Sequence, residues 1–508
     1  MAQFVSAIRS GATGSGKTVH CLYENAPLIG QRNAPALVVI DPHGTLAESF
    51  ALKALEKGLI GSDRFVYDPL SKTANVPGYE YLKPSTHQDQ FQRAAENRER
   101  IEEAKSILLR HRNVMDANNN PMIDEGLTNV LSLFINQKSP VPFAWMMHAF
   151  SRESDVHHYL IANCADAETQ RVFAFYQGLP PREWEFACGP AGRILRKICQ
   201  SPQFQVRTQA TFCLETLLNR GGMLLLDGSS KGNLARTDMA TIMGMVILQV
   251  IQLARNGRLG RHVILIIDEG PNAGLIDGNV ARAMAEGRKW NLSFELMVQN
   301  PLTFSPDRAI IEGVYQNARR QYWFMQMDYE AIRHAASVCA SANYDPHLIH
   351  SVQTRTRLEH AGFEEFDVVN TSSWESNGRA GTGTSKNRVS RPRYAEREEE
   401  TVRYLSPADQ QAMFMRKFQS LEVGWHFFRF ENFVSPEPIY TPMERTLWHG
   451  LSSKNPKISL AVKKLHDALD AIKDRPEYQS RNLPELPKLE TPQGRGINRL
   501  GRQSKRQS

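Results

Sequence analysis

Residues 11–18 have the types and spacing needed to bind the phosphates of a nucleotide. The segment Gly-Ala-Thr-Gly-Ser-Gly-Lys-Thr matches the phosphate-binding loop G-x-x-x-x-G-K-[ST] at every position. Its glycines allow the tight turn that aims backbone N–H groups at phosphate oxygens. Lys17 supplies positive charge for the β- and γ-phosphates, and the Thr18 hydroxyl can hold Mg²⁺. We therefore predict an ATP and Mg²⁺ site in which the nucleotide is bound by Gly11, Thr13, Gly14, Ser15, Gly16, Lys17 and Thr18.

A pair of adjacent acids supplies further groups that nucleotide hydrolysis requires. Asp268 and Glu269 directly follow the apolar run Val-Ile-Leu-Ile-Ile. An aspartate at a strand end can reach Mg²⁺ through its water, and an adjacent glutamate can polarise the attacking water. We predict Asp268 as the metal-site acid, together with Thr18, and Glu269 as the general base. Two other strand-terminal acids, Asp41 and Asp227, are expected to organise loops.

Two kinds of residue beyond this pair are candidates for contact with the γ-phosphate. Gln299 ends a predicted strand, and its amide can both donate and accept a hydrogen bond. Arg288, within Glu-Gly-Arg-Lys-Trp, and the pair Arg319 and Arg320 are candidates for a transition-state arginine supplied to a neighbouring subunit. From the residues alone, each lone arginine fits a solvated surface charge better than this role.

These residues require a parallel sheet to bring them together. Residues 4–9 predict the strand before the loop, and a helix is expected from Thr18 onward. Short apolar runs that end in acid, followed by segments 293–298 and 321–327, predict further strands. Their alternation with helices indicates an α/β fold with a doubly wound, mainly parallel sheet. Such sheets bind ligands at the carboxyl ends of their strands, where the loop and the acids lie.

The predicted core is interrupted and extended by other segments. Residues 85–215 show helical patterns without a convincing parallel strand, which predicts an all-helical domain inserted into the core. The predicted organisation is a core in two parts (1–84 and 216–370), the helical insert (85–215), a disordered Ser/Gly/Arg-rich linker (371–400), strands completing the core (401–445), and a helix with a basic disordered tail (446–508).

Composition sets limits on location and partners. The 508 residues carry a net charge of +7, and residues 493–508 contain five basic residues and no acid, so the remainder carries only +2. This balance permits DNA binding without establishing it. Six cysteines without zinc-ligand spacing are typical of reduced thiols in a cytoplasmic protein. The longest apolar run, 239–254, contains two glutamines and predicts a buried core helix, so we expect no membrane anchor.

Taken together, the motifs resemble a known superfamily. The phosphate-binding loop, Val-Ile-Asp-Pro-His-Gly at 39–44, Ile-Ile-Asp-Glu-Gly at 266–270, Glu-Gly-Arg-Lys at 286–289 and Gln-Asn-Pro at 299–301 are similar to those of the FtsK–HerA superfamily of DNA-pumping ATPases. Within it, the chain is most similar to the TraG/TraD-type coupling ATPases of conjugation and type IV secretion. The resemblance covers about residues 4–440 and is loose in the helical insert.

The resemblance implies a RecA-like P-loop NTPase core that assembles into a ring, expected to be a hexamer, with ATP at each subunit boundary. The catalytic residues would be Lys17, Glu269, Arg288 and Gln299, with Arg288 reaching a neighbour's γ-phosphate and Gln299 linking hydrolysis to DNA movement. The implied partners are DNA, a relaxase and channel components. Members often carry membrane helices before the loop. Membrane association is therefore expected only through partners or a missing N-terminal region, and the expected location is the cytoplasm, at the inner face of the membrane where partners hold it.

Three functions remain open at this level. The favoured one is an ATP-driven DNA translocase that delivers DNA with bound relaxase to a secretion or conjugation channel. The second is a secretion-channel or viral packaging ATPase that moves protein or DNA. The third is a non-hydrolysing adaptor that binds ATP to hold one conformation. Glu269 argues against the adaptor, because a pure switch does not need a water-activating acid.

Overall fold

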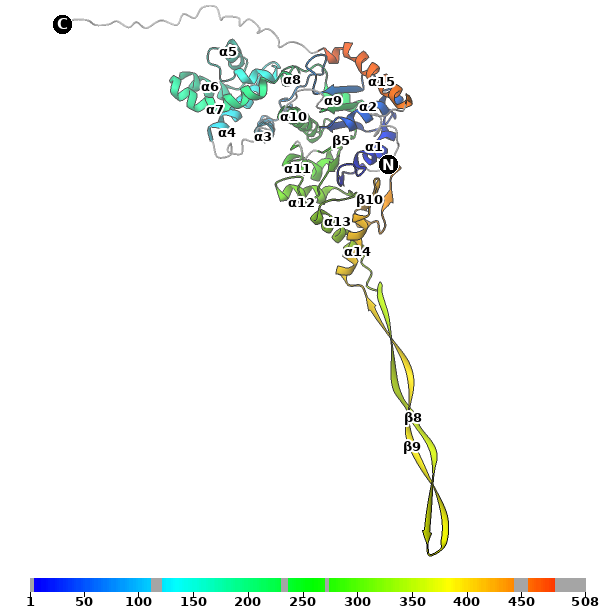
Figure 1. Cartoon of the computed structure of the whole chain (residues 1–508). Coiled ribbons are helices and arrows are strands. Elements are labelled where there is room, and N and C mark those ends of the chain that lie inside the picture. The colour runs from blue at the N-terminus through cyan, green and yellow to red at the C-terminus, as the bar shows by residue number, and fades with distance from the viewer. Residues whose placement is uncertain (1–3, 111–120, 230–235, 270–273, 443–455, 480–508) are drawn as a thin grey trace, which may run out of the picture. The chain divides into compact units, whose positions relative to one another are not determined.

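The computed structural model describes residues 4–110, 121–229, 236–269, 274–442 and 456–479 (Figure 1). The chain divides into two units, one of residues 1–332 and 419–508 and the other of residues 333–418. The first unit contains the phosphate-binding loop and the sheet that follows it. The second contains a long hairpin and helical residues on either side of it. Each unit is described by itself below.

The first unit is built on a ten-stranded sheet whose main path has the order β11-β10-β7-β1-β6-β5-β2-β4-β3, with β12 beside β10. The seven strands from β7 to β3 are parallel, which confirms the predicted doubly wound α/β sheet. Strand β10 adds to β7 in the antiparallel direction. The strands are β1 (Ala7–Ser10), β2 (Ala36–Asp41), β3 (Phe65–Pro69), β4 (Met223–Asp227), β5 (Val263–Ile267), β6 (Leu292–Val298), β7 (Arg320–Trp323), β10 (Trp425–Phe430), β11 (Phe433–Val434) and β12 (Ile439–Tyr440).

Helices cover both faces of this sheet because its central strands are apolar on both sides. Alternate residues of a strand point to opposite faces. Leu37 and Val39 accordingly pack in a core with α1 (Lys17–Asn25), α2 (Thr45–Glu56) and α15 (Pro456–Ala471). Val38 and Ile40 pack in the opposite core, to which α9 (Leu214–Asn219), α10 (Arg236–Arg255), α11 (Gly278–Glu286) and α12 (Arg308–Asn317) contribute.

Helix α10 contains the long apolar run noted in the sequence. Residues 237–255 are long and apolar enough to cross a membrane, and 83% of that apolar window is buried inside the fold. Met243, Val246 and Val250 are fully buried in the core with strand residues such as Leu265. The helix is therefore buried in the core, as the sequence predicted for this apolar run.

The segment between β3 and β4 is helical, as the sequence predicted for the insert. It contains α3 (Gln90–Arg110), α4 (Pro121–Ile135), the 3-10 helix η3 (Phe143–His148), α5 (Asp155–Ala162), α6 (Ala167–Gly178), α7 (Pro181–Cys199), α8 (Pro202–Gln205) and α9. A fully buried ion pair fixes its end to the sheet, because Arg207 Nη2 lies 2.7 Å from Asp68 Oδ1. The Arg207 guanidinium also donates to the carbonyl oxygens of Lys72 and Gln203, so its charge is well satisfied.

The second unit differs from the sequence prediction. Residues 371–400 were predicted as a disordered linker, but they lie in strands β8 (Ile349–Ser376) and β9 (Arg379–Tyr404), which pair antiparallel. Residues 401–404 belong to β9, while α13 (Tyr329–Ala342) precedes the hairpin and α14 (Pro407–Gln419) follows it. The prediction was wrong because composition reports only the capacity to bury apolar surface, whereas cross-strand backbone hydrogen bonds hold this pair.

Candidate nucleotide-binding site

The loop of residues 11–18 connects β1 to α1 at the carboxyl edge of the sheet. Gly14 and Gly16 have φ angles of 78° and 105°, in the left-handed region that favours glycine. A Cβ atom on Gly11 would lie only 2.6 Å from Cβ of Phe324, so this glycine is required by close packing against the chain beyond β7. The Gly11 and Ala12 N–H groups donate to the carbonyl oxygens of Val298 and Met325, which tie the loop to the ends of β6 and β7.

Lys17 is held over the loop from which it arises. Its side chain is buried, and Nζ donates to the carbonyl oxygens of Gly11 at 2.6 Å and Ala12 at 2.9 Å. Burial lowers the pKa of Lys17, while Asp268 and Glu269 oppose that shift. The ammonium is therefore a charge concentrated inside the curve of the loop, which is the position that phosphate binding requires. Thr13 is exposed at the tip, and Ser15 and Gly16 are buried.

Asp268 and Thr18 meet as the metal prediction requires. Thr18 Oγ1 lies 3.5 Å from Asp268 Oδ2, and Asp268 Oδ1 is buried without a hydrogen-bond partner in the described structure. Burial, with the charges of Asp41 and Glu269, raises the pKa of Asp268 to about 8. A cation bound to the Asp268 carboxylate would stabilise its ionised form and so oppose this rise in pKa. A hydroxyl and a carboxylate suit Mg²⁺, which takes one or two protein oxygens and completes its shell with phosphates and water. The residues therefore fit the ion.

Glu269 is fixed by two neighbours at the end of β5. His43 Nε2 lies 2.6 Å from Glu269 Oε2, and the Gln299 side chain forms a hydrogen bond with the same carboxylate. These bonds lower the pKa of Glu269 to about 2 and the contact raises the pKa of His43. Glu269 also has a φ angle of 44°, a strained conformation for a residue with a side chain. The structure thus brings Glu269, Gln299 and Lys17 to one edge.

His43 was not singled out from the sequence. It follows β2 directly, and only the motif Asp-Pro-His-Gly at 41–44 signalled its place. Asp41 positions it, because Asp41 Oδ1 accepts from the His43 N–H at 2.8 Å and Oδ2 accepts from the N–H groups of Leu46 and Ala47 at the start of α2. Asp227 holds a second loop through the Ser229 N–H. Both acids therefore organise loops, as expected.

The arginine candidates lie away from the carboxyl edge. Arg288 is exposed in the 3-10 helix η5 (Gly287–Trp290), directly before β6. The seven residues of β6 separate it from Gln299 by roughly 20 Å. Arg288 can therefore act on a nucleotide only if that nucleotide belongs to another subunit. Arg320 is an ion-pair partner of Glu295 at 2.5 Å, which contradicts its candidacy, and Arg319 pairs with Glu431 at 3.1 Å.

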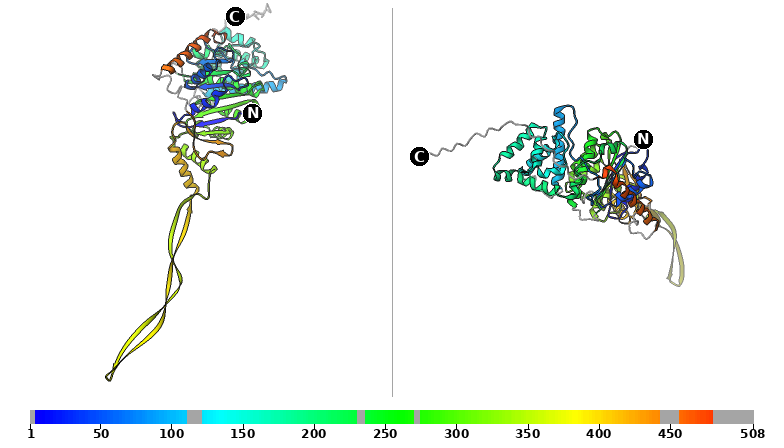
Figure 2. Two further views of the ribbon diagram at one scale, coloured as in Figure 1. Left: turned by 90° about the vertical axis from the view of Figure 1, so that its right-hand side faces the viewer. Right: turned by 90° about the horizontal axis from the view of Figure 1, so that it is seen from above.

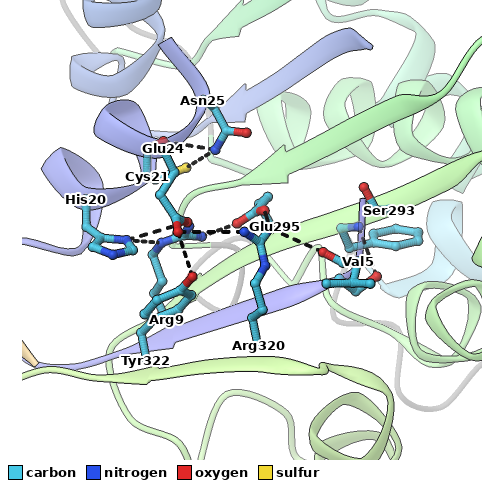
Figure 3. Close-up of polar contacts among 12 residues, drawn as sticks. Val5, Arg9, His20, Cys21, Glu24, Asn25, Ser293, Glu295, Arg320 and Tyr322 are labelled. Atoms are coloured by element: carbon cyan, nitrogen blue, oxygen red, sulfur yellow. Dashed lines mark hydrogen bonds and ion pairs between the residues drawn. The ribbon is translucent and has the colours of Figure 1, made fainter. Parts of the chain in front are cut away.

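A buried polar cluster fixes α1 to three strands (Figure 3). Arg9 of β1 is fully buried and forms ion pairs with Glu24 of α1 and Glu295 of β6. Arg9 Nε also lies 2.9 Å from His20 Nδ1, and the Tyr322 hydroxyl of β7 donates to Glu24 at 2.7 Å. Because α1 begins with Lys17 and Thr18, this cluster positions the two residues that the sequence predicts to bind phosphate and metal. The sequence carried no local signal for it.

The chain beyond β7 also contacts the phosphate-binding loop. The Gly424 N–H donates to the carbonyl oxygen of Ser15 at 3.1 Å, just before β10. His426, the second residue of β10, lies against His20 with ring centroids 4.7 Å apart. The sheet order, the loop and the acid at the end of β5 together define a RecA-like P-loop NTPase fold.

Comparisons with known proteins give structural similarities only. No protein-family model matches the sequence, and no curated protein matches it. Solved structures with a similar course include the bacterial conjugative coupling protein TrwBdeltaN70, with 14% identity over 87% of this chain and 85% of that one and a TM-score of 0.47. The plasmid coupling protein TrwB with ADP and Mg²⁺ has 13% identity over 87% and 86%, and VirB4 of Thermoanaerobacter pseudethanolicus has 12% over 86% and 90%, both with a TM-score of 0.47. Because these identities are at most 14% and the TM-scores are 0.47, the functional proposal below is based on the residues of the site.

Proposed function

We propose that this protein is a Mg²⁺-dependent ATPase that moves DNA, as a coupling protein of conjugation or type IV secretion does. One observation supports hydrolysis above all others. Glu269 is ionised and oriented by His43 and Gln299, one residue from the buried Asp268. A protein that only bound ATP would not need a strained, preoriented carboxylate at this place.

The chain's own residues divide the work of hydrolysis. Lys17 binds the β- and γ-phosphates, while the Thr18 hydroxyl and Asp268 hold Mg²⁺, which neutralises phosphate charge when bound. Glu269 orients and polarises the attacking water. With a pKa of about 2 it is a weak base, so it acts by holding the water in line and accepting its proton late.

We infer that the remaining charge is supplied by a second copy of the chain. Arg288 is exposed at the amino edge of its own sheet, which suits an arginine that reaches a neighbour's γ-phosphate in a ring of subunits. Gln299 forms a hydrogen bond with the proposed general base at the end of β6, so it would transmit hydrolysis to the β6–α12 connection. We propose a homo-oligomer, a hexamer by resemblance, that works at the cytoplasmic side of a secretion channel with a relaxase.

Steady-state ATPase activity tests this proposal. The purified chain is assayed with and without single- and double-stranded DNA over a range of protein concentrations. We expect turnover to rise with DNA and with protein concentration, as subunits assemble. DNA-indifferent turnover would favour a protein-moving secretion ATPase, and no turnover at any concentration would favour the ATP-binding adaptor.

A further inference from the structure

The hairpin of β8 and β9 lacks any packed layer of its own. The two strands form a separate two-stranded sheet, and no residue from 349 to 404 is buried. Figures 1 and 2 show the hairpin as a twisted two-stranded ribbon. A two-stranded ribbon alone is marginally stable in water, and its edges expose unpaired backbone groups. The surface of the ribbon is therefore open to a partner that would add contacts to it.

Charge is segregated along the ribbon. The distal half, defined here as residues 368–394 around the turn, has five basic residues and one acid, a net charge of +4. The proximal half, defined as residues 349–367 and 395–404, has four basic residues and eight acids, a net charge of −4. The net charge of the whole hairpin is thus zero, although its distal end is cationic. A polyanion would be attracted to the distal half and repelled by the proximal half.

Most of the distal positive charge is available to a ligand. Arg388 lies 3.7 Å from both Glu365 and Asp367, so its charge is partly used within the ribbon. The other four basic side chains are exposed, and none of them takes part in an ion pair found among the residues that the structure describes. They are Arg379, Lys386, Arg391 and Arg393.

One face of the distal half combines part of this charge, Arg379 and Arg391, with an exposed aromatic ring, while Lys386 lies on the opposite face. Cross-strand register places Trp374 opposite Gly381, and places Phe366, at the boundary with the proximal half, opposite Val389. These pairs share a face because alternate residues of a strand point the same way. Trp374 is 59% exposed, and Gly381 leaves its indole open on that side, since a Cβ there would lie 3.0 Å from the ring. The same face carries hydroxyl and amide side chains: Asn370, Ser372, Ser385 and Asn387.

We propose that the distal half of the hairpin, residues 368–394, is a nucleic-acid-binding surface. Its free arginines and lysine contact backbone phosphates, its serines and asparagines add polar contacts, and Trp374 packs against bases. A two-stranded ribbon also has the width that the major groove of a DNA duplex admits. This inference rests on the proposed DNA-moving function and assigns DNA contact to a surface outside the nucleotide site. The acidic proximal half confines the contact to the distal end.

Binding of labelled DNA by the full chain, measured by fluorescence anisotropy at several salt concentrations, tests the surface. In one variant Arg379, Lys386, Arg391 and Arg393 are changed to Gln. The matched control changes the four proximal arginines, Arg355, Arg357, Arg397 and Arg403, to Gln and so removes the same charge. We expect the distal variant to bind at least about tenfold more weakly and to lower the slope of log K against log salt by about 3, since each lost phosphate contact removes roughly 0.7–0.9. The proximal control should bind within about threefold of the parent and keep most of its salt slope, because its arginines lie among the acids of the proximal half and are not proposed to contact phosphate.

A second variant separates base contact from charge. Trp374→Ala should weaken binding about fivefold or more and leave the salt slope unchanged, because stacking involves no counterion release. Duplex and single-stranded oligonucleotides are compared in each case. ATPase activity without DNA should be equal in all variants, which shows that the first unit is intact.

Three outcomes would overturn the inference. The distal variant could bind DNA with the parent's affinity and slope, the two charge variants could lose binding equally, or the parent chain could bind no DNA. Loss of self-association in the distal variant, with DNA binding retained, would instead identify a second copy of the chain as the occupant. If the distal charges govern DNA binding while DNA leaves ATP turnover unchanged, the surface stands and the translocase proposal fails.

Discussion

His43 Nε2 lies 2.6 Å from Glu269 Oε2, and this contact joins the loop after β2 to the end of the neighbouring strand β5. It carries charge, because the pKa of His43 is raised and that of Glu269 is lowered to about 2. A charged hydrogen bond of this kind restricts the rotamer of the carboxylate. The histidine therefore orients the proposed base, and we class it as a positioning residue.

Replacing His43 tests that role. His43→Ala should lower kcat about tenfold, which corresponds to losing one hydrogen bond to a charged group, and should leave the KM for ATP nearly unchanged. His43→Gln, which keeps a donor, should recover much of the loss. Steady-state kinetics of the three proteins give the answer. A rise in KM without a change in kcat would show that His43 serves nucleotide binding instead.

Replacing Glu269 by Gln removes the carboxylate and preserves its shape. We expect hydrolysis to fall by at least about a hundredfold, in the range found for loss of a general base, while ATP binding persists. Binding of a fluorescent ATP analogue and release of phosphate measure the two properties separately. Thr216→Ala, which changes an exposed residue of α9, serves as a control. Turnover that survives Glu269→Gln would remove the catalytic assignment.

The position of Arg288 makes its role testable by mixing subunits. Arg288→Ala should lower kcat about a thousandfold if the arginine stabilises transferred phosphate. Lys17→Ala should be inactive for a different reason. An equimolar mixture of the two proteins should regain activity, because some subunit boundaries then contain an intact Lys17 and an intact Arg288. Arg308→Ala, which removes another exposed arginine, should behave as the parent. Failure of the mixture to recover would exclude action between subunits.

The buried pair of His20 and His426 should make the fold sensitive to mild acid. Burial lowers the pKa of both imidazoles, and that of His426 to about 4. Their folded-state pKa values lie below the unfolded value of about 6.5, so the unfolded chain binds protons first. The stabilising contribution is complete above pH 6.5 and falls as pH decreases toward 4, by roughly 3 kcal/mol for His426. Urea unfolding at a series of pH values measures this, and His426→Phe should flatten the dependence. An unchanged profile in that variant would exclude His426 as a cause.

Glu295 tests the cluster that fixes α1. It faces two arginines, Arg9 and Arg320, and Glu295→Ala would leave both short of a buried partner. We expect a loss of about 3–5 kcal/mol in the free energy of unfolding, with weaker ATP binding in the protein that remains folded. Glu431→Ala breaks the half-exposed pair with Arg319 and should cost less than about 1 kcal/mol. Equal losses in the free energy of unfolding in the two variants would show that the buried cluster stabilises the fold no more than an exposed ion pair does.

Local sequence was enough to predict several parts of this protein. The phosphate-binding loop, the acids at the end of β5 and the helical insert each depend on neighbouring residues, so their patterns are visible along the chain. The predicted strands also appeared close to their places, although β1 begins at Ala7 and β7 ends at Trp323, short of the predicted 321–327. Strand ends shift because they depend on pairing with neighbours, which the sequence of one strand does not show.

Tertiary structure alone decided which distant residues meet. The sheet order places β1 between β6 and β7, and this pairing brings Arg9 to Glu295 although 286 positions separate them in the sequence. It also sets Gln299 and His43 around Glu269, and puts Arg288 at the opposite edge from its own nucleotide loop. The hairpin of residues 349–404 is likewise held by pairing between segments whose composition favours disorder. A local motif can specify the chemistry of a group, but long-range strand pairing specifies its partners.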